Sequence, residues 1–267
     1  MIQLSRFRDF VDTVLFGREL RCASCGRIAD RSGMCSQCKE RIAYVLPPIC
    51  SLCGTPLRLL GPKTRGESAS NPENQVCSGC ATTRHYFERA RAVAVYNGAA
   101  RDHIHELKYR ARTELVAPLA RMMAEVAIGD GMAGECQCVV PVPLHPEKAA
   151  RRGFNQAQLL AEDVGRLLGI PLEAKALQRQ RSAGSQTFLD RRDRRANVIQ
   201  AFLCPFPALV SQRNVLLVDD VLTSGATADG CSRALLMAGA AKVYVLTFGV
   251  SVADERDWFE APGSSRA

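Results

Sequence analysis

Apolar residues follow two different patterns after about residue 85 of the chain. Continuous apolar runs predict buried strands, and apolar residues three or four positions apart predict amphipathic helices. The predicted strands cover 90–96, 138–142, 214–219 and 242–250, and the predicted helices cover 99–109, 114–127, 155–168 and 226–238. Strands that alternate with helices of this length predict an α/β fold with a parallel sheet covered on both faces.

The first 85 residues follow a different pattern. Apolar positions at helical spacing over 4–18 predict a short amphipathic helix, which docks on its own protein or, less favoured, on a partner. Cysteines follow, and 58–76 is polar and rich in Gly, Pro, Ser and Asn, which predicts a protruding loop. We therefore divide the chain into a helix at 1–19, a metal module at 20–83, an α/β domain at 84–260 and a tail at 261–267.

Eight of the 12 cysteines form four Cys-x-x-Cys pairs before residue 81. Two thiolates on one tight turn can bind the same metal ion, so four pairs predict two zinc sites with four thiolate ligands each. The predicted ligands are Cys22, Cys25, Cys35, Cys38, Cys50, Cys53, Cys77 and Cys80. Gly26, Gly54 and Gly79 lie in or after these pairs, where a tight turn favours a residue that tolerates positive φ.

Disulfides are the competing interpretation of these cysteines. Asp9 and Asp12 lie where a secretory signal needs an apolar run, so we expect a reducing, cytoplasmic location and hence zinc. Ligand pairing in sequence order is favoured, although an interleaved pairing also fits the spacing. Such a module is expected to be structural, because so short a segment buries too little surface to fold without metal. The four remaining cysteines have no ligand spacing and are expected to be free thiols: Cys136, Cys138, Cys204 and Cys231.

Composition narrows the class of protein. The 267 residues are 47% hydrophobic and 23% charged, which excludes a largely disordered chain. No uncharged apolar run reaches about 18 residues, so no membrane span is expected. The formal net charge of +8 indicates an anionic partner without naming it.

The strongest chemical motif follows the strand predicted at 214–219. Asp219 and Asp220 come at its end, where ligands bind in open α/β sheets. The next residues, 223–227, are Thr-Ser-Gly-Ala-Thr before a predicted helix, so hydroxyls, backbone N–H groups and the positive helix end predict a phosphate cradle. Two acids beside a phosphate cradle indicate ribose hydroxyls, or Mg²⁺ bound to them, as additional ligands. Capping acids before an ordinary turn are the alternative.

Residues 215–227 resemble the signature of type I phosphoribosyltransferases: four apolar residues, two acids, two spacers and Thr-Ser-Gly-x-Thr. The chain is also similar to the ComF family, named for competence protein F. The similar segments are Val-Val-Pro-Val-Pro-Leu-His-Pro at 139–146, Arg-Arg-Gly-Phe-Asn-Gln-Ala at 151–157, and Leu177-x-Arg179-x-Arg181-x4-Gln186-x2-Leu189 with Arg194, Asn197, Ala201 and Phe202. Ala183 replaces a Thr that is usual in the family, and the loop between Cys53 and Cys77 is long.

The resemblance implies a substrate, phosphoribosyl pyrophosphate (PRPP), bound with Mg²⁺. Asp219 and Asp220 would hold the ribose hydroxyls and the 223–227 turn the 5′-phosphate. That second group of ligands is Thr223, Ser224, Gly225, Ala226 and Thr227. The strand end at 141–145, with Pro143, Leu144 and His145, matches the position of the pyrophosphate loop, and Arg151 and Arg152 are near enough in sequence to assist it.

Residues 175–195 carry seven basic side chains against two acids and match the family's catalytic loop. Arg179, Arg181 and Gln186 are the predicted catalytic residues, because cations that meet the departing pyrophosphate would lower the barrier. A solvated basic helix is the alternative. Lys108 and Arg110 are weaker candidates for an anion contact, and His85 has no evident partner.

Two functions therefore remain open. One is a phosphoribosyltransferase with an unknown acceptor, in natural transformation with DNA-uptake proteins or in nucleotide metabolism. The other is a non-catalytic accessory that handles single-stranded DNA with its zinc ribbons and basic loop. Stacking of single strands needs exposed aromatic residues, for which Tyr44, Tyr86 and Phe87 are the few candidates in or beside the ribbons.

Overall fold

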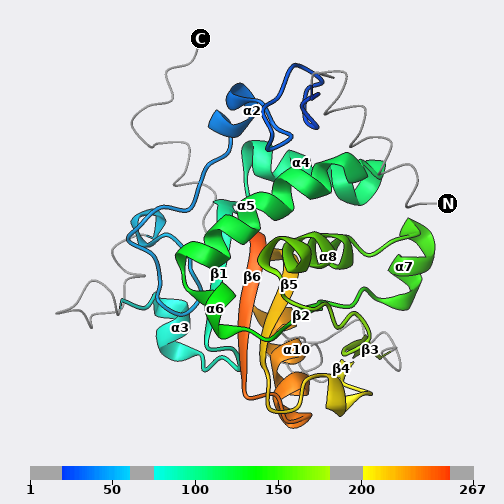
Figure 1. The fold of residues 1–267 in the computed structure, drawn as a ribbon. Helices are drawn as coiled ribbons and strands as arrows, with labels where there is room; N and C mark the ends of the chain where they lie inside the picture. Colours follow the sequence, from blue (N-terminus) through cyan, green and yellow to red (C-terminus); the bar gives the residue numbers. More distant parts are fainter. Residues whose placement is uncertain (1–19, 61–74, 181–200, 253–267) are drawn as a thin grey trace, which may run out of the picture.

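The structure is a computed structural model that describes residues 20–60, 75–180 and 201–252 (Figure 1). The predicted helix over 4–18, most of the predicted loop at 58–76, residues 181–195 of the predicted catalytic loop and the tail lie outside these ranges. The described residues form one α/β body, to which the two cysteine-rich segments are attached.

Four parallel strands form the central sheet in the order β1-β6-β5-β2. Their bounds are β1 Arg89–Val95, β2 Cys138–Pro141, β5 Asn214–Leu222 and β6 Lys242–Val250. The α/β prediction with a parallel sheet is thus confirmed. β5 runs three residues beyond its predicted end at 219, because its pairing with β6 continues to Leu222 opposite Val250. Asp219 and Asp220 consequently lie inside the last part of β5 and not beyond it.

Helices cover both faces of the sheet (Figure 1). One face carries α4 Gly98–Arg110, α5 Val116–Gly129 and α8 Gln156–Leu168, and the other carries α10 Ala226–Met237. Smaller elements are α2 Ser36–Glu40, α3 Ser78–Thr82, α6 Met132–Glu135, α7 Pro146–Arg152, a two-residue antiparallel pair of β3 Gln178–Arg179 with β4 Phe202–Leu203, and 3-10 turns at 57–59, 113–115 and 207–209.

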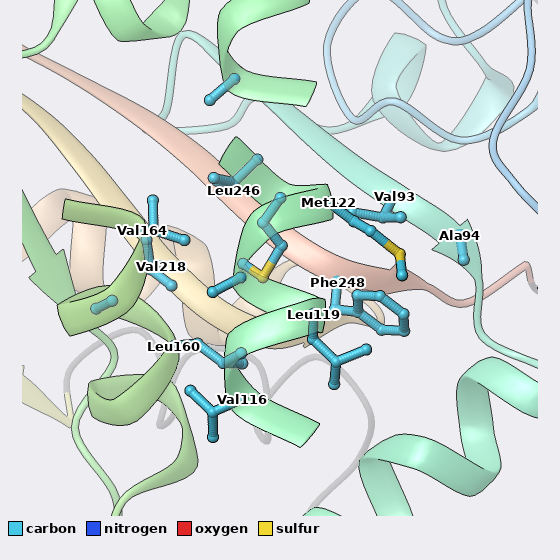
Figure 2. Packing of buried hydrophobic residues seen from close by; sticks show 14 of the residues in the cluster. Val93, Ala94, Val116, Leu119, Met122, Leu160, Val164, Val218, Leu246 and Phe248 are labelled. Atoms are coloured by element: carbon cyan, nitrogen blue, oxygen red, sulfur yellow. The ribbon is translucent and has the colours of Figure 1, made fainter. Parts of the chain in front are cut away.

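The core has one large apolar cluster on each face of the sheet. In the first, Leu119 and Leu160 of the helices pack with Val218 and Phe248 of the strands, and all four are fully buried (Figure 2). The second lies between the sheet and α10 and includes fully buried Leu217, Cys231 and Val245 among its members. Burial of each large apolar side chain contributes about 1.5–3 kcal/mol, so these two clusters hold the helices on the sheet.

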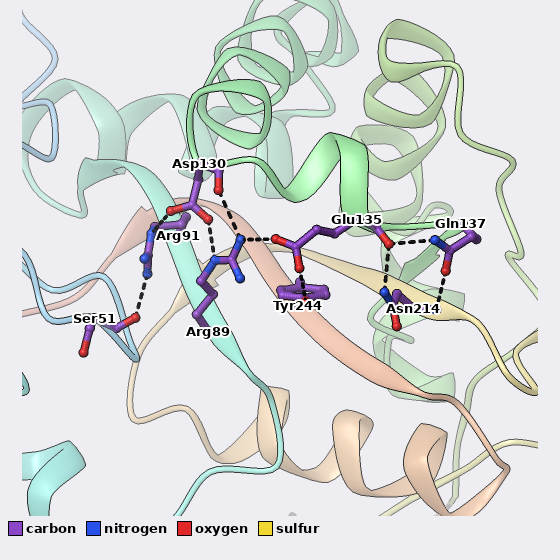
Figure 3. A network of polar contacts seen from close by, with 8 residues as sticks. All are labelled: Ser51, Arg89, Arg91, Asp130, Glu135, Gln137, Asn214 and Tyr244. Atoms are coloured by element: carbon purple, nitrogen blue, oxygen red, sulfur yellow. Dashed lines mark hydrogen bonds and ion pairs between the residues drawn. The ribbon is translucent and has the colours of Figure 1, made fainter. Parts of the chain in front are cut away.

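Ion pairs connect the first residues of β1 to the segment that contains the end of α5 and α6 (Figure 3). Asp130 accepts a hydrogen bond from Arg89 Nε at 2.6 Å and pairs with Arg91, both on β1. Arg89 Nη2 lies 2.6 Å from Glu135, whose other carboxylate oxygen accepts a hydrogen bond from the Tyr244 hydroxyl at the start of β6. The network thus ties β1 and β6 to the α5–α6 region, and Arg89 lies beside Tyr244 near the start of these two strands.

The cysteine-rich segments pack on the sheet and on the first helical layer. Tyr44 bridges to Ala94 on the free edge of β1, and Ala90 N donates to Leu52 O at 2.6 Å. Gly54 adopts φ +72°, and a Cβ at this position would lie 2.7 Å from Ala90 O. Only glycine allows this close approach of the second cysteine-rich segment to β1.

Candidate functional site

The eight cysteines before residue 81 form two separate groups in sequence order. Cys22, Cys25, Cys35 and Cys38 make the first cluster, and Cys50, Cys53, Cys77 and Cys80 make the second. Within each group all four sulfur atoms lie within 4.8 Å of one another. The interleaved pairing is therefore wrong, because it would join cysteines from different groups.

The sulfur spacing fits tetrahedral zinc. Zn–S bonds of about 2.3 Å in a tetrahedron place neighbouring sulfur atoms about 3.8 Å apart. Cys25 and Cys35 Sγ are 3.7 Å apart, and so are Cys53 and Cys77 Sγ, whereas a disulfide would require about 2.05 Å. The thiolates also receive backbone N–H groups: Cys77 N lies 3.3 Å from Cys50 Sγ. Two four-cysteine sites of this kind support structural zinc.

Local turns place the ligands. Gly26 and Gly54 follow their cysteine pairs with φ of +75° and +72°, as expected, whereas Gly79 is helical within α3. The thiols outside the clusters have no cysteine partner: Cys136, Cys138, Cys204 and Cys231 are free. Burial raises the pKa of Cys138 to about 11 and that of Cys136 to about 12, so both are inert apolar side chains at neutral pH.

The 223–227 turn lies where β5 ends and α10 begins. Thr223 and Ser224 are exposed, and Gly225 adopts φ +76° before the first helical residue, Ala226. The turn therefore offers two accessible hydroxyls beside the N–H groups at the start of a 12-residue helix. This is the chemistry of an anion site, because the helix end carries partial positive charge and unpaired donors.

The two acids before the turn face opposite sides of the sheet. Asp219 lines a small cavity beneath α10 together with Thr223 and Thr227. Asp220, which is only 4% exposed, contacts Lys108 of α4 and Gln156 of α8 on the other side. Burial, followed by the negative charge of Asp220, raises the pKa of Asp219 well above its usual range. The two acids are adjacent in sequence, but successive side chains of a strand point to opposite faces, so their carboxylates lie on different sides of the sheet.

A chain of polar contacts surrounds Asp220. Its carboxylate forms an ion pair with Lys108 and accepts a hydrogen bond from Gln156 Nε2 at 3.5 Å. Arg152 donates to Gln156 Oε1 and lies over the ring of Tyr109 at 5.5 Å. This arrangement neutralises one acid next to the turn. Lys108 was predicted as an anion contact, and its anion here is a carboxylate of the same chain, while Gln156 was not predicted.

The segment after β2 adjoins the same strand end. Val142 N donates to Val218 O at 2.9 Å, which places 143–145 beside the end of β5. His145 is half-buried and caps α7, where its Nδ1 accepts from Glu147 N at 3.4 Å. Arg152 is half-buried and Arg151 is exposed, both on α7. The predicted pyrophosphate residues thus lie on a loop and a short helix at the carboxyl end of β2, and their role stays a prediction.

The predicted catalytic residues are only partly covered by the structure. Arg179 lies on β3, with its guanidinium 5.4 Å from the centre of the Phe202 ring on β4. Arg181 and Gln186 lie outside the described residues, so their role stays a prediction.

His85, which had no evident partner in the sequence, connects the second cluster to the turn. Its Nδ1 lies 3.0 Å from the Asp229 carboxylate and its Nε2 lies 3.4 Å from Cys80 Sγ. A cavity of about 280 Å³ lies between the cluster and the turn, lined by Cys53, Thr55, Cys80, His85, Thr223 and Ser224 among others. No sequence spacing revealed this contact, because 144 residues separate His85 from Asp229.

Known proteins are similar to this protein over most of the chain. Residues 11–81 match the model of the double zinc ribbon domain. DNA utilization protein YhgH of Escherichia coli is 32% identical over 219 residues, which cover 80% of this chain and 95% of that protein. The chain belongs to the ComF family. Other members are competence protein F of Haemophilus influenzae, 28% identical over 84% of this chain and 94% of the relative, and competence protein ComFC of Bacillus subtilis, 25% identical over 78% and 80%.

Solved structures similar to this ComF-family chain include glutamine PRPP amidotransferase from Bacillus subtilis, complexed with ADP and GMP. The match covers 53% of this chain and 30% of that one, with 22% identity and a TM-score of 0.32. A likeness of this size is confined to part of the chain. In the part of the chain that the structure describes, no helix combines the length and apolar character needed to cross a bilayer.

Proposed function

We propose that this ComF-family protein binds PRPP with Mg²⁺ at the carboxyl ends of β5 and β2 and transfers the phosphoribosyl group to an acceptor. The observation that carries the proposal is the 223–227 turn, with exposed hydroxyls at the start of α10 directly after two acids. Reduced cysteine clusters favour the cytoplasm, and the names of the relatives favour a role in DNA utilization or uptake.

Each group of described residues would bind a different part of PRPP. Hydroxyls and N–H groups of the turn would bind the 5′-phosphate, and Asp219 lies beside them for a ribose hydroxyl. Asp220 forms an ion pair with Lys108. It would therefore bind a ribose hydroxyl only if its carboxylate served Lys108 and the ribose at the same time. The 143–145 loop with Arg151 and Arg152 would hold pyrophosphate, whose growing charge cations stabilise as it departs. Mg²⁺, when bound, would neutralise pyrophosphate charge, and carboxylate oxygens are its usual protein ligands.

Calorimetry with PRPP, with and without Mg²⁺, tests this proposal. We expect binding to the wild type that weakens about tenfold or more in the variants Asp219→Ala and Thr223→Ala, since each loses a hydrogen bond to a charged ligand. Lys242→Ala is the matched control, because Lys242 is exposed at the amino end of β6, far from the turn. Absence of binding to the wild type, or equal affinity in all four proteins, contradicts the proposal.

A second function, electrostatic binding of single-stranded DNA, is favoured by two exposed aromatic residues. Tyr44 is 40% and Tyr86 46% exposed, whereas Phe87 is buried and drops out as a stacking candidate. Affinity for an oligonucleotide measured over a salt series decides this function. A logarithmic slope of several units indicates phosphate contacts, and Tyr44→Ala and Tyr86→Ala should weaken binding. A flat response excludes it.

A further inference from the structure

His85 lies between the second cysteine cluster and the start of α10 and contacts both. It follows the second cysteine cluster in the chain, and only 7% of its side chain is exposed. Its ring stacks on Phe87 with centroids 4.6 Å apart, which fixes the plane of the imidazole. Both ring nitrogens have partners: Cys80 Sγ at 3.4 Å and the Asp229 carboxylate at 3.0 Å.

Asp229 is a residue of the first turn of α10, immediately after the 223–227 turn. Its side chain is 1% exposed and also accepts a hydrogen bond from Tyr86 N at 3.0 Å. Asp229 N in turn donates to Gly225 O at 2.8 Å. The His85 contact therefore holds the helix start whose backbone N–H groups form the anion site.

The His85 ring also packs directly on the turn. A Cβ on Gly225 would lie 3.5 Å from His85 Cε1, so the ring is in contact range of the backbone that adopts φ +76°. Cys80, His85, Thr223 and Ser224 line the same cavity between the cluster and the turn. Any movement of Cys80 on metal loss is thus transmitted to the turn through one rigid ring.

We propose that the second zinc site is a working part of the anion site: His85 is a positioning residue that couples the metal bound by Cys50, Cys53, Cys77 and Cys80 to the 223–227 turn. The metal fixes Cys80, Cys80 and Asp229 fix the imidazole, and the imidazole fixes Gly225 and the start of α10. Metal loading raises the anion affinity of the turn, and a bound anion raises the metal affinity of the second cluster by the same factor, because coupling between two binding sites is reciprocal. The inference rests on the proposed function for its anion.

Cadmium-113 NMR of the full-length, cadmium-loaded protein tests the coupling, because each cluster gives its own resonance. Addition of PRPP with Mg²⁺ should shift the resonance of the second cluster and leave that of the first unchanged. Asp229→Asn should also move the second resonance and should weaken metal binding at that cluster in a chelator competition, because it removes the carboxylate that orients His85 against the ligand Cys80.

His85→Phe separates coupling from packing. Phenylalanine keeps an aromatic ring for the stack on Phe87 and is only slightly larger than histidine, but it lacks both ring nitrogens. A role in packing alone predicts wild-type behaviour for this variant, whereas coupling predicts the loss of the PRPP-induced shift and about tenfold weaker PRPP binding. His103→Phe is the matched control, since His103 Nε2 lies 2.9 Å from Ser24 Oγ, and Ser24 lies between Cys22 and Cys25 of the first cluster. It should move only the first resonance and leave PRPP affinity unchanged.

The outcomes are distinguishable. An unchanged first resonance in His85→Phe and Asp229→Asn shows that the variants are folded. If PRPP binds but the second resonance moves neither with PRPP nor in the two variants, the coupling is refuted and the proposed function stands. If PRPP does not bind at all, the proposed function fails, and a second resonance and metal affinity unchanged in Asp229→Asn then refute the coupling as well.

Discussion

Lys108 and Asp220 form an ion pair that joins the last turn of α4 to β5 just before the 223–227 turn. Asp220 is 6% exposed at its side chain and Lys108 20%, so water does little to replace either partner. The pair explains how two adjacent acids can precede an anion site: one of them is neutralised by a cation of the same chain.

Lys108→Met should destabilise the protein, because Asp220 would be left buried with only Gln156 as a partner. Loss of one partner from a buried polar pair costs about 1–3 kcal/mol. Urea unfolding at neutral pH measures the change, and Lys242→Met, at an exposed position, serves as the control. The double variant Lys108→Met/Asp220→Asn should be less than additive, and additivity within about 0.5 kcal/mol would show that the pair does not interact.

Asp219→Asn should stabilise the protein at neutral pH. Burial and the charge of Asp220 raise the pKa of Asp219 in the folded state, so the folded protein binds this proton more tightly than the unfolded chain does. Stability is therefore lost as the pH rises from the unfolded pKa of about 3.9 through the raised folded value. Asparagine does not ionise, so Asp219→Asn does not lose stability in this way.

The advantage of Asp219→Asn over the wild type should vanish near about pH 4 and should grow as the pH rises toward neutral, as urea unfolding over a pH series will show. Asp102→Asn, at an exposed position on α4, is the control. A variant less stable than the wild type at neutral pH would mean that Asp219 is ionised with a compensating partner.

The two zinc sites should differ in their effect on stability. Cys22 and Cys38 of the first cluster pack with the main core around Leu119, whereas the second cluster has a small apolar cluster of its own with Leu57. Cys38→Ser and Cys80→Ser should each reduce zinc from two ions per chain to one. Cys38→Ser should lower the Tm more than Cys80→Ser does. The expected fall for Cys38→Ser is about 10 °C, because a loss of roughly 3 kcal/mol of stability lowers the Tm by about 2–4 °C for each kcal/mol.

Metal analysis and calorimetry check this difference. Two zinc ions in either variant would contradict the assignment of ligands. An equal fall in Tm in both variants would show that the first cluster is no more a part of the core than the second.

The ion pairs around Asp130 should be structural only. Asp130→Asn removes the carboxylate that pairs with Arg91 and leaves Arg89 with Glu135 alone, and should cost about 1–3 kcal/mol of stability. PRPP affinity should stay the same, because Arg89, Asp130 and Glu135 lie near the start of the strands, whereas the 223–227 turn follows the end of β5. A loss of PRPP affinity in a folded Asp130→Asn protein would contradict that separation.

The sequence by itself determined every element with a strong local signal. All four strands of the central sheet and the helices α4, α5, α8 and α10 follow from apolar periodicity to within a few residues, because both patterns are short-range. Helix α7 was not predicted, since its seven residues, Pro-Glu-Lys-Ala-Ala-Arg-Arg, contain no apolar stripe. The zinc ligands and the 223–227 turn were also visible, because their chemistry depends on fixed spacing within one segment.

Only the tertiary structure decided how distant residues meet. The grouping of eight cysteines into two clusters, the separation of Asp219 from Asp220 across β5, and the contacts of Lys108 and His85 all depend on how the layers pack. His85 and Asp229 are brought together because the second cluster packs on the edge of β1 beside the start of α10, and no local pattern encodes that distance. Local sequence specifies which groups are available, and the packing of helices and ribbons on the sheet specifies which of them touch.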